Sequence, residues 1–488
     1  MLIPLAFPPG IHRNGTDLEA TGRWNNASLV RWNQGAMQPV GGWTQRVAAS
    51  FATPARGARA WSDNTGTLWL GLGTSSKLYA VNQAGTVSDI TPVGLVAGTG
   101  DATQNLGFGG GLFGVGTFGT PRADTAAYEP ATTWSMDTWG QNLLACSSKD
   151  RKIYEWSLNV ANPAVAVVNA PTADFVLTSE ERFVFALGAG NDPRKVQWSD
   201  RENNTLWAPA LTNEAGSITL NIPGKIMCGV KVRGQVLILT DQTAHTATYI
   251  GPPFVHSVEQ VGDACGIISR RAVATAEDGA FWMGDGGFFR FMGGSVQEIP
   301  CEVHDHVFQG LTTAQKSKTY SVSNTKFGEI WWHYPGDSDT ECSDYVAYNY
   351  RENFWMIGKM SRTAGVDVGA FRNPIAVAPS GTIYNHETGA MMDGAEVFAE
   401  SGPLSFGEVV ATALQMFPDE KTRGEVEVTF KTRYYPNGAE SSHGPYAMGL
   451  PTNLRFTGRQ VAMRLDGVAE TPWRVGVNQL KIQARGMR

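Results

Sequence analysis

The chain has 488 residues, of which 42% are hydrophobic and 17% charged, and its net charge is −6. This composition excludes a disordered or coiled-coil protein, and it excludes a polycation that coats DNA. The 56 glycines and the 50 Trp, Phe and Tyr residues are typical of a turn-rich β protein.

The charge is distributed unevenly along the chain. Residues 1–57 carry five arginines against two acids, and residues 401–488 carry eleven Lys and Arg against eight acids. The remaining residues, 58–400, carry 23 Lys and Arg against 35 acids. Two mildly basic ends therefore flank an acidic body with a net charge of −12.

Three features bear on the compartment. The five cysteines are scattered and form no Cys-x-x-Cys pair, which favours reduced, buried thiols in a protein made in the cytosol. The N-terminus lacks a basic region before its short, proline-interrupted apolar run, so we expect no signal peptide. Because no stretch of 18 apolar residues occurs, the sequence predicts no membrane span.

Residues 1–57 are predicted to form an extended arm. Closely spaced turn residues interrupt the segment, and its apolar residues fit neither a single strand nor a helix. Such a segment cannot make a core of its own, so it must pack on the body or on a neighbouring subunit. We propose Arg23, Trp24, Arg31 and Trp32 as assembly contacts.

Residues 58–399 repeat one pattern, in which a short alternating apolar run, a Gly, Asp or Asn turn and a second run follow one another. These hairpins recur every 40–55 residues, roughly the spacing of β-propeller blades. Six units are clear and a seventh is possible around residues 374–384, although no Trp-Asp dipeptide marks a WD-repeat protein. The alternatives are a large β-sandwich or two barrels.

Two further segments differ in texture. Residues 107–119 are rich in glycine and contain Phe108, Phe113 and Phe118, so they are predicted to form a linker or a tip loop that lines a passage. Residues 400–488 contain three alternating strands and are predicted to form a small antiparallel, sandwich-like domain. The predicted fold class is thus all-β: a propeller-like body of about six to seven blades, an N-terminal arm and a C-terminal β-domain.

The sequence offers little catalytic chemistry. Glu302, His304 and His306 alternate, which would suit a metal site on a strand, but the residues after Pro300 are expected to be helical through Gln315, where these side chains diverge. No nucleophile elbow, phosphate-binding loop or dinucleotide-binding motif occurs. We therefore expect no enzymatic activity, no metal and no cofactor.

Several segments nonetheless resemble a known family. They include Arg31-Trp32, Gly41-Gly42-Trp43 and Glu329-Ile330-Trp331-Trp332-His333-Tyr334. The complete set is residues 8–16, 22–32, 39–43, 329–335, 345–353, 362–364, 386–389, 457–460 and 473–476. The chain resembles the tail nozzle proteins of short-tailed bacteriophages, also called packaged-DNA stabilisation or tail tubular proteins.

This resemblance implies a β-propeller with appended β-domains and a ring of six copies below the head–tail connector of the virion tail, assembled in the host cytoplasm. Its implied partners are further copies of the chain, the connector or adaptor, tail fibres and a plug or needle. Genomic double-stranded DNA would pass through the lumen, and the acidic body suits a wall that does not retain it. The alternative is a carbohydrate-binding or carbohydrate-active propeller with exposed tryptophans on a concave face.

Overall fold

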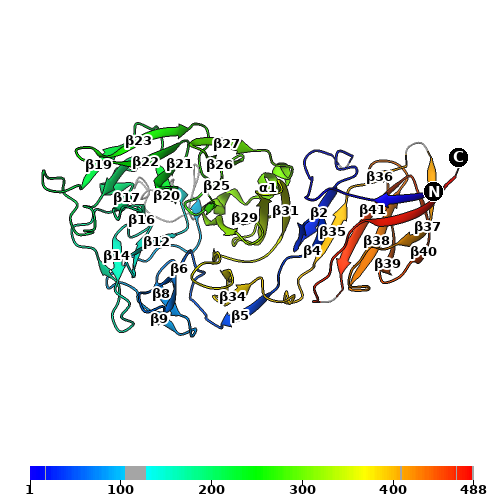
Figure 1. Cartoon of the computed structure of the whole chain (residues 1–488), viewed down its shortest axis with the longest axis horizontal. Helices are drawn as coiled ribbons and strands as arrows, with labels where there is room; N and C mark the ends of the chain where they lie inside the picture. Colours follow the sequence, from blue (N-terminus) through cyan, green and yellow to red (C-terminus); the bar gives the residue numbers. More distant parts are fainter. Residues whose placement is uncertain (17, 105–127, 278, 407–408, 469, 486–488) are drawn as a thin grey trace, which may run out of the picture.

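The computed structural model describes the chain except residues 17, 105–127, 278, 407–408, 469 and 486–488. Figure 1 shows an elongated molecule with a propeller at one end and a two-sheet sandwich at the other. The first and last strands of the chain, β1 and β42, pair with each other in the sandwich (Figure 1). The dark blue N-terminal segment runs from the sandwich to the propeller, so it contributes to both bodies.

The propeller has seven four-stranded antiparallel blades in the described part of the chain. Blades 1 to 3 are β6 Gly57–Ser62, β7 Leu68–Gly73, β8 Leu78–Asn82 and β9 Val87–Asp89; β12 Trp134–Trp139, β13 Asn142–Ser147, β14 Ile153–Trp156 and β15 Val165–Ala166; and β16 Phe175–Thr178, β17 Val184–Leu187, β18 Lys195–Trp198 and β19 Gly216–Thr219. Blades 4 to 6 are β20 Ile226–Val232, β21 Gln235–Thr240, β22 Ala244–Gly251 and β23 Val255–Gly262; β24 Val273–Ala276, β25 Gly279–Met283, β26 Phe288–Met292 and β27 Ser295–Ile299; and β28 Tyr320–Asn324, β29 Glu329–Tyr334, β30 Asp344–Asn349 and β31 Phe354–Lys359.

Blade 7 closes the ring with a strand from the other end of the chain. Its strands are β32 Ala364–Val366, β33 Ile375–Val377, β34 Ile383–His386 and β5 Trp43–Val47. The innermost strands β6, β12, β16, β20, β24, β28 and β32 contact one another in sequence, and β32 returns to β6. Because β5 pairs with β34, the N-terminal segment fixes the last blade to the rest of the chain.

Tryptophan packing holds neighbouring blades together. The Trp134 ring of blade 2 covers Gly73 of blade 1, where a side-chain carbon would lie only 2.3 Å from the ring. Trp134 Nε1 also donates to the Thr74 carbonyl at 2.6 Å. Glycine is therefore required at position 73 by close approach, which the sequence alone does not show.

The second body is a β-sandwich that includes N-terminal strands. Its sheets follow the orders β1-β42-β37-β40 and β2-β35-β41-β38-β39, with β36 also paired to β41. The strands are β1 Leu2–Leu5, β2 Trp24–Ser28, β35 Phe398–Ser401, β36 Leu404–Ser405, β37 Val410–Phe417, β38 Val426–Arg433, β39 Ser441–Ala447, β40 Thr452–Gly458, β41 Gln460–Gly467 and β42 Asn478–Arg485. Buried and half-buried residues alternate along most of β38, as a strand with one face on the core requires.

A few elements lie outside blades and sandwich. The hairpin of β3 Val30–Asn33 and β4 Ala36–Pro39 lies between the two bodies, because Leu29 N bonds to Tyr345 of blade 6 and Met37 pairs with Val475 of the sandwich. The remaining elements are β10 Thr103–Gln104, β11 Tyr128–Glu129, and the short helices η1 Ala189–Asn191, α1 His304–Gly310 and η2 Thr313–Lys318.

The predicted all-β fold class with a propeller body is confirmed, and seven blades are present. From the second blade onward, the innermost strands begin 41 to 51 residues apart. The segment 1–57, predicted as an extended arm that packs on the body or on a neighbouring subunit, contributes strands to the sandwich, to a connecting hairpin and to blade 7 of the same chain. The physical reason is that an isolated strand is not stable in water, and its backbone N–H and C=O groups find partners only when the strand joins a sheet.

Candidate functional site

Arg31 lies at the centre of a buried charge cluster. It sits on β3, its side chain is 1% exposed, and its Nη2 lies 2.9 Å from Glu329 Oε2 and 2.6 Å from Glu387 Oε1. Its Nη1 donates to Glu387 Oε2 at 2.9 Å. One guanidinium therefore joins blade 6, through Glu329, to the end of β34 in blade 7, where Glu387 follows the strand.

Other donors complete this Arg31 cluster. Trp331 Nε1 donates to Glu329 Oε2 at 2.9 Å, and Asn324 Nδ2 donates to Glu387 Oε1 at 2.9 Å. The backbone N–H of Gly41 donates to Glu387 Oε2 at 3.1 Å. The pKa of Glu329 is raised above its ordinary value, because the effect of burial exceeds the opposing effect of the Arg31 charge. Burial alone would lower the pKa of Arg31, but the two carboxylates raise it above its ordinary value.

The other proposed assembly contacts also face the chain itself. Trp24 and Trp32 are buried, and the Trp32 ring packs edge-on against Phe354 of blade 6 at 5.9 Å. Arg23 pairs with Glu302 at 2.5 Å. The sequence left open whether these residues contact the body or a neighbour, and the structure places all four against the chain's own body.

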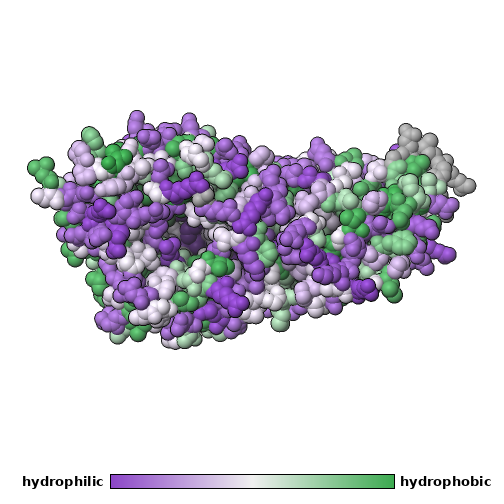
Figure 2. All heavy atoms as spheres, viewed as in Figure 1, coloured by the Kyte–Doolittle hydropathy of each residue, from purple (hydrophilic) through white to green (hydrophobic). Residues whose placement is uncertain are grey.

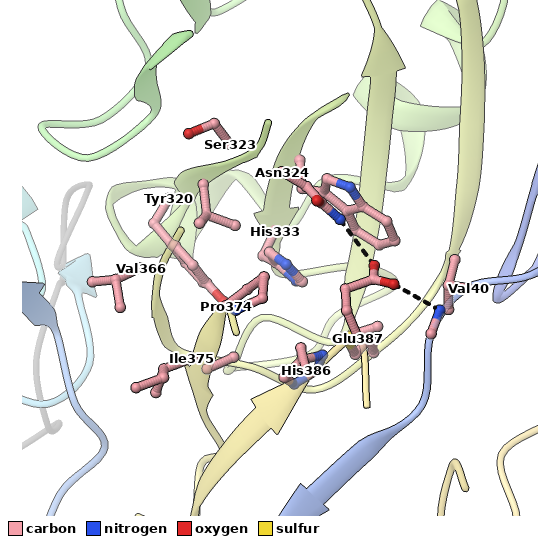
Figure 3. Close-up of a pocket in the computed structure, with 15 residues that line it drawn as sticks. Val40, Tyr320, Ser323, Asn324, His333, Val366, Pro374, Ile375, His386 and Glu387 are labelled. Carbon is pink, nitrogen blue, oxygen red and sulfur yellow. Dashed lines mark hydrogen bonds between the residues drawn. The ribbon is translucent and has the colours of Figure 1, made fainter. Parts of the chain in front are cut away.

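A cavity lies between blades 6 and 7, next to the Arg31 cluster (Figure 3). Its volume is about 50 Å³, enough for one or two waters or small polar groups. Tyr320 and Asn324 come from β28, His333 from β29, and His386 and Glu387 from the end of blade 7. Figure 3 shows these polar side chains arranged around the same space.

Several polar atoms around this blade 6–7 cavity are buried without a hydrogen-bond partner among the described residues. They are Tyr320 Oη, His333 Nδ1 and Asn324 Oδ1, on side chains that are 2%, 3% and 6% exposed. A buried polar atom without a partner costs about 1–3 kcal/mol.

The histidines of this cavity are neutral at physiological pH. Burial lowers the pKa of His333 to about 3, and it lowers the pKa of His386 well below its ordinary value. Arg362 Nε donates to His386 Nε2 at 3.0 Å, so the proton of this imidazole lies on Nδ1. Burial also raises the pKa of Tyr320 well above its ordinary value, so its hydroxyl keeps its proton.

Sequence reasoning missed this cavity. A usable signal was present in Glu329-Ile330-Trp331-Trp332-His333-Tyr334, because all six residues of this strand are buried although Glu329, His333 and Tyr334 are ionisable. A glutamate and a histidine in a fully buried strand must find partners. The sequence could not say that the cation paired with Glu329 is Arg31, which lies 298 positions away in the chain.

A second charge cluster joins the innermost strands of four consecutive blades. Asp137 of blade 2 lies 2.8 Å from Arg59 Nη2 of blade 1 and 2.9 Å from Lys231 Nζ of blade 4. It also accepts the Thr178 backbone N–H of blade 3 at 3.0 Å. One carboxylate thus connects four blades. Figure 2 shows a hollow with hydrophilic residues around it at the propeller end of the molecule.

The base of the predicted tip loop is held on the propeller. Strands β10 and β11 pair with each other, and Ala102 exchanges two hydrogen bonds of 2.9 and 3.0 Å with the Gln315 side chain on η2. Ala131 N bonds to Ser317 Oγ at 3.1 Å. Phe108, Phe113 and Phe118, proposed to line a passage, lie outside the described residues.

The segment considered above as a metal site, residues 302–306, leads into a helix, as the sequence predicted. His304 and His306 lie on α1, and Glu302 pairs with Arg23 instead. Within the described ranges, no group of three or more His, Cys, Asp or Glu residues is placed to hold a metal ion. The helices described are also too short or too polar for any of them to cross a bilayer.

No protein-family model and no curated protein matches the chain. Among solved structures, the chain is similar to virginiamycin B lyase from Staphylococcus aureus, with 8% identity over 68% of this chain and 94% of that one and a TM-score of 0.42. It is also similar to the Pan2 WD40 domain of Neurospora crassa, with 9% identity over 72% and 95% and a TM-score of 0.38. A third similar structure is the N-terminal domain of Nup159, with 9% identity over 74% of this chain and 98% of that one and a TM-score of 0.37. The propeller assignment therefore rests on the strand pairing described above.

Proposed function

We propose that this chain is a structural protein of a short phage tail, six copies of which form a nozzle ring below the head–tail connector. In this proposal the ring retains packaged DNA, conducts it during ejection and helps to attach tail fibres. The role is structural rather than catalytic. The observation that carries the proposal is the Arg31 cluster.

The three charged residues of this cluster come from three separate segments of the nozzle resemblance. Arg31 belongs to residues 22–32, Glu329 to residues 329–335 and Glu387 to residues 386–389. They meet within 2.6–2.9 Å in the folded chain. The segments that resemble the nozzle family therefore act together as one structural device, which supports a shared architecture.

In the proposed ring, duplex DNA travels through the lumen enclosed by the six copies rather than along the axis of one propeller. Within one propeller, Asp137 of blade 2 pairs with Arg59 of blade 1 and with Lys231 of blade 4. We further propose that the wall of this lumen is net negative, consistent with the −12 charge of residues 58–400.

We propose that exposed apolar residues on the sandwich contact other copies of the chain or other tail proteins. Figure 2 shows hydrophobic residues gathered on this end of the molecule. The exposed ones include Val409, Tyr434, Tyr435, Leu450, Val468 and Val477. Apolar and aromatic side chains of this kind are common in the cores of protein interfaces.

The carbohydrate alternative lacks the platform that it would need. Fourteen of the fifteen tryptophans are buried, and the remaining one, Trp139, is half-buried with Arg182 stacked on its ring at 5.3 Å. No tryptophan is therefore available as an exposed face for a sugar ring. This observation favours the structural proposal over a lectin-like propeller.

Electron microscopy and mass photometry of the purified chain, alone and mixed with the connector ring, test the proposal. We expect six-fold rings with an open lumen lined mainly by acidic and neutral residues. A chain that stays monomeric with the connector present would contradict the proposal. A lumen lined mainly by Lys and Arg would contradict its electrostatic part.

A further inference from the structure

A pocket of about 360 Å³ lies at the end of the propeller where the innermost strands begin. Thr133 precedes β12, Lys225 precedes β20, and residues 267–270 precede β24. Lys316 and Ser317 lie on η2, which precedes β28. Segments that lead into four different blades therefore line this propeller-mouth pocket, and its volume falls within the range of small-molecule sites, about 300–1,000 Å³.

Arg270 is a largely buried cation of this pocket whose N–H groups find few acceptors. Its side chain is 15% exposed, and in the described structure its guanidinium makes no hydrogen bond. Asp174 Oδ2 lies 3.6 Å from Arg270 Nη2, which is beyond hydrogen-bond length, while Oδ1 of the same carboxylate lies 2.9 Å from Arg151 Nε. Nε of Arg270 is buried without a partner, whereas its terminal Nη1 and Nη2 are not sealed in this way. The two terminal nitrogens are therefore the atoms of Arg270 that a ligand in the pocket can reach.

A guanidinium with free terminal N–H groups favours an anion. Nη1 and Nη2 present parallel N–H groups, and their spacing matches the two oxygens of a carboxylate or a phosphate. Hydrogen bonds between charged groups of this kind are roughly twice as strong as those between neutral groups. An anion bound to both nitrogens of Arg270 would supply the acceptors that the chain itself does not.

The other charges of the pocket favour an anion with a single charge. Lys225 is exposed and, among the described residues, has no carboxylate within 4 Å, while Lys316 pairs with Asp285 at 2.8 Å. Asp241 also lines the pocket and accepts the backbone N–H of Lys225 at 3.0 Å. The three cations and two carboxylates of the lining leave a net charge of +1, which one negative charge neutralises. A dianion such as a phosphate monoester would bring excess negative charge close to Asp241 and Asp285.

Much of the remaining lining is apolar. Ile267 and Ile268 are buried, and Met227 is half-buried on β20. Tyr128 and Pro130 add an aromatic and an aliphatic ring. A surface of this kind favours a hydrocarbon chain or ring over a hydrated polar group.

We propose that the propeller-mouth pocket binds a small monocarboxylate with a hydrocarbon or aromatic body. The carboxylate bonds to Nη1 and Nη2 of Arg270, and the body packs against Ile267, Ile268 and Met227. This site goes beyond the tail function proposed above and does not depend on it.

Saturation-transfer NMR and calorimetry on the full chain test this site with phenylacetate and hexanoate. Phenylacetamide has the ring of phenylacetate without the negative charge, so it is the matched ligand control. Inorganic phosphate, added as a competitor, tests an anion without a carbon body. We expect saturation transfer to phenylacetate or hexanoate, little transfer to phenylacetamide, and displacement by phosphate only at concentrations above those of the carboxylate.

Arg270→Met removes the guanidinium and should weaken carboxylate binding roughly ten- to hundredfold. Arg372→Met makes the same substitution at an exposed residue between β32 and β33 of blade 7, so it is the matched control and should bind like the original chain. Lys225→Met keeps the test decisive if Arg270→Met does not fold, because Lys225 is exposed. It should bind roughly two- to fivefold more weakly, and this difference should shrink at high salt.

Four results would overturn the proposal. They are an absence of transfer to both carboxylates, equal binding of phenylacetamide, phosphate that displaces phenylacetate at the lower concentration, and binding that is unchanged in a folded Arg270→Met. If Arg270→Met is unfolded, unchanged binding in Lys225→Met overturns it instead.

Discussion

Removing the guanidinium of Arg31 is the sharpest test of how the two bodies are joined. In Arg31→Met, a side chain of similar length replaces a group that is 1% exposed, and the carboxylates of Glu329 and Glu387 lose their only cation within 4 Å in the described structure. Breaking a buried ion pair by removing one partner typically costs about 3–5 kcal/mol. We expect a loss of that size in the free energy of unfolding, measured by urea titration at pH 8.

The pH dependence gives this prediction a distinctive sign. Without the guanidinium, burial of Glu329 should raise the pKa of this carboxylate further above its value in the unfolded chain. A carboxylate with a raised pKa favours folding while it is protonated, and that contribution is lost as pH rises through the folded pKa. The variant should therefore lie closest to the original chain near pH 5 and farthest from it at pH 8.

Two controls make the result interpretable. Lys77→Met breaks an ion pair with Asp89 on the surface, where both side chains are nearly half exposed, and should leave stability unchanged. The triple variant Arg31→Met, Glu329→Gln, Glu387→Gln removes all three charges and should recover part of the loss. A loss below 1 kcal/mol in Arg31→Met, or a loss that does not depend on pH, would refute the reasoning.

Four further predictions concern other parts of the chain. Asp137→Asn should lower the free energy of unfolding by roughly 1–3 kcal/mol. The loss should stay within this range because the side chains of Arg59 and Lys231 are over a third exposed to solvent. Burial opposes the charge of Asp137, but the two cations lower its pKa, so the loss should be present at pH 7 and fade as pH falls below about 4. Trp43→Ala should cost about 3–5 kcal/mol and speed amide exchange in β34, measured by mass spectrometry, and unchanged exchange would argue against closure by β5. Cys146 should resist thiol reagents at pH 8 until the chain unfolds, because burial raises its pKa to about 12. The chain should show no retention of duplex DNA at 50 mM salt by fluorescence anisotropy, and micromolar binding with a steep salt dependence would contradict an acidic wall.

The repeating part of the fold was predictable because it is local. Each blade is a series of antiparallel strands joined by short turns, so alternation and turn residues record it within about 45 residues of sequence. The pairing of β5 with β34 joins residues more than 300 positions apart. No local pattern in Trp43–Val47 indicates which strand it meets, so the closure of blade 7 was not predictable.

The candidate site was hidden for a related reason. Arg31 and Trp32 were identified as contact residues from the mismatch between an apolar segment and any regular periodicity. Their partners follow only from the arrangement of blades 6 and 7, which places Glu329 and Glu387 next to each other. The cavity lies between blades 6 and 7, and the sequence indicated blade 7 only as a possible seventh unit.

The Arg31 cluster also couples the assembly of the two bodies. Glu329 and Glu387 lie in the propeller, and Arg31 reaches them from a hairpin whose other strand pairs at Met37 with Val475 of the sandwich. Two buried carboxylates without a cation are costly, so the contact between blades 6 and 7 at Glu329 and Glu387 becomes favourable only when the hairpin has brought Arg31 to them. Because the same segment continues into β5, docking of the hairpin and closure of blade 7 should occur together.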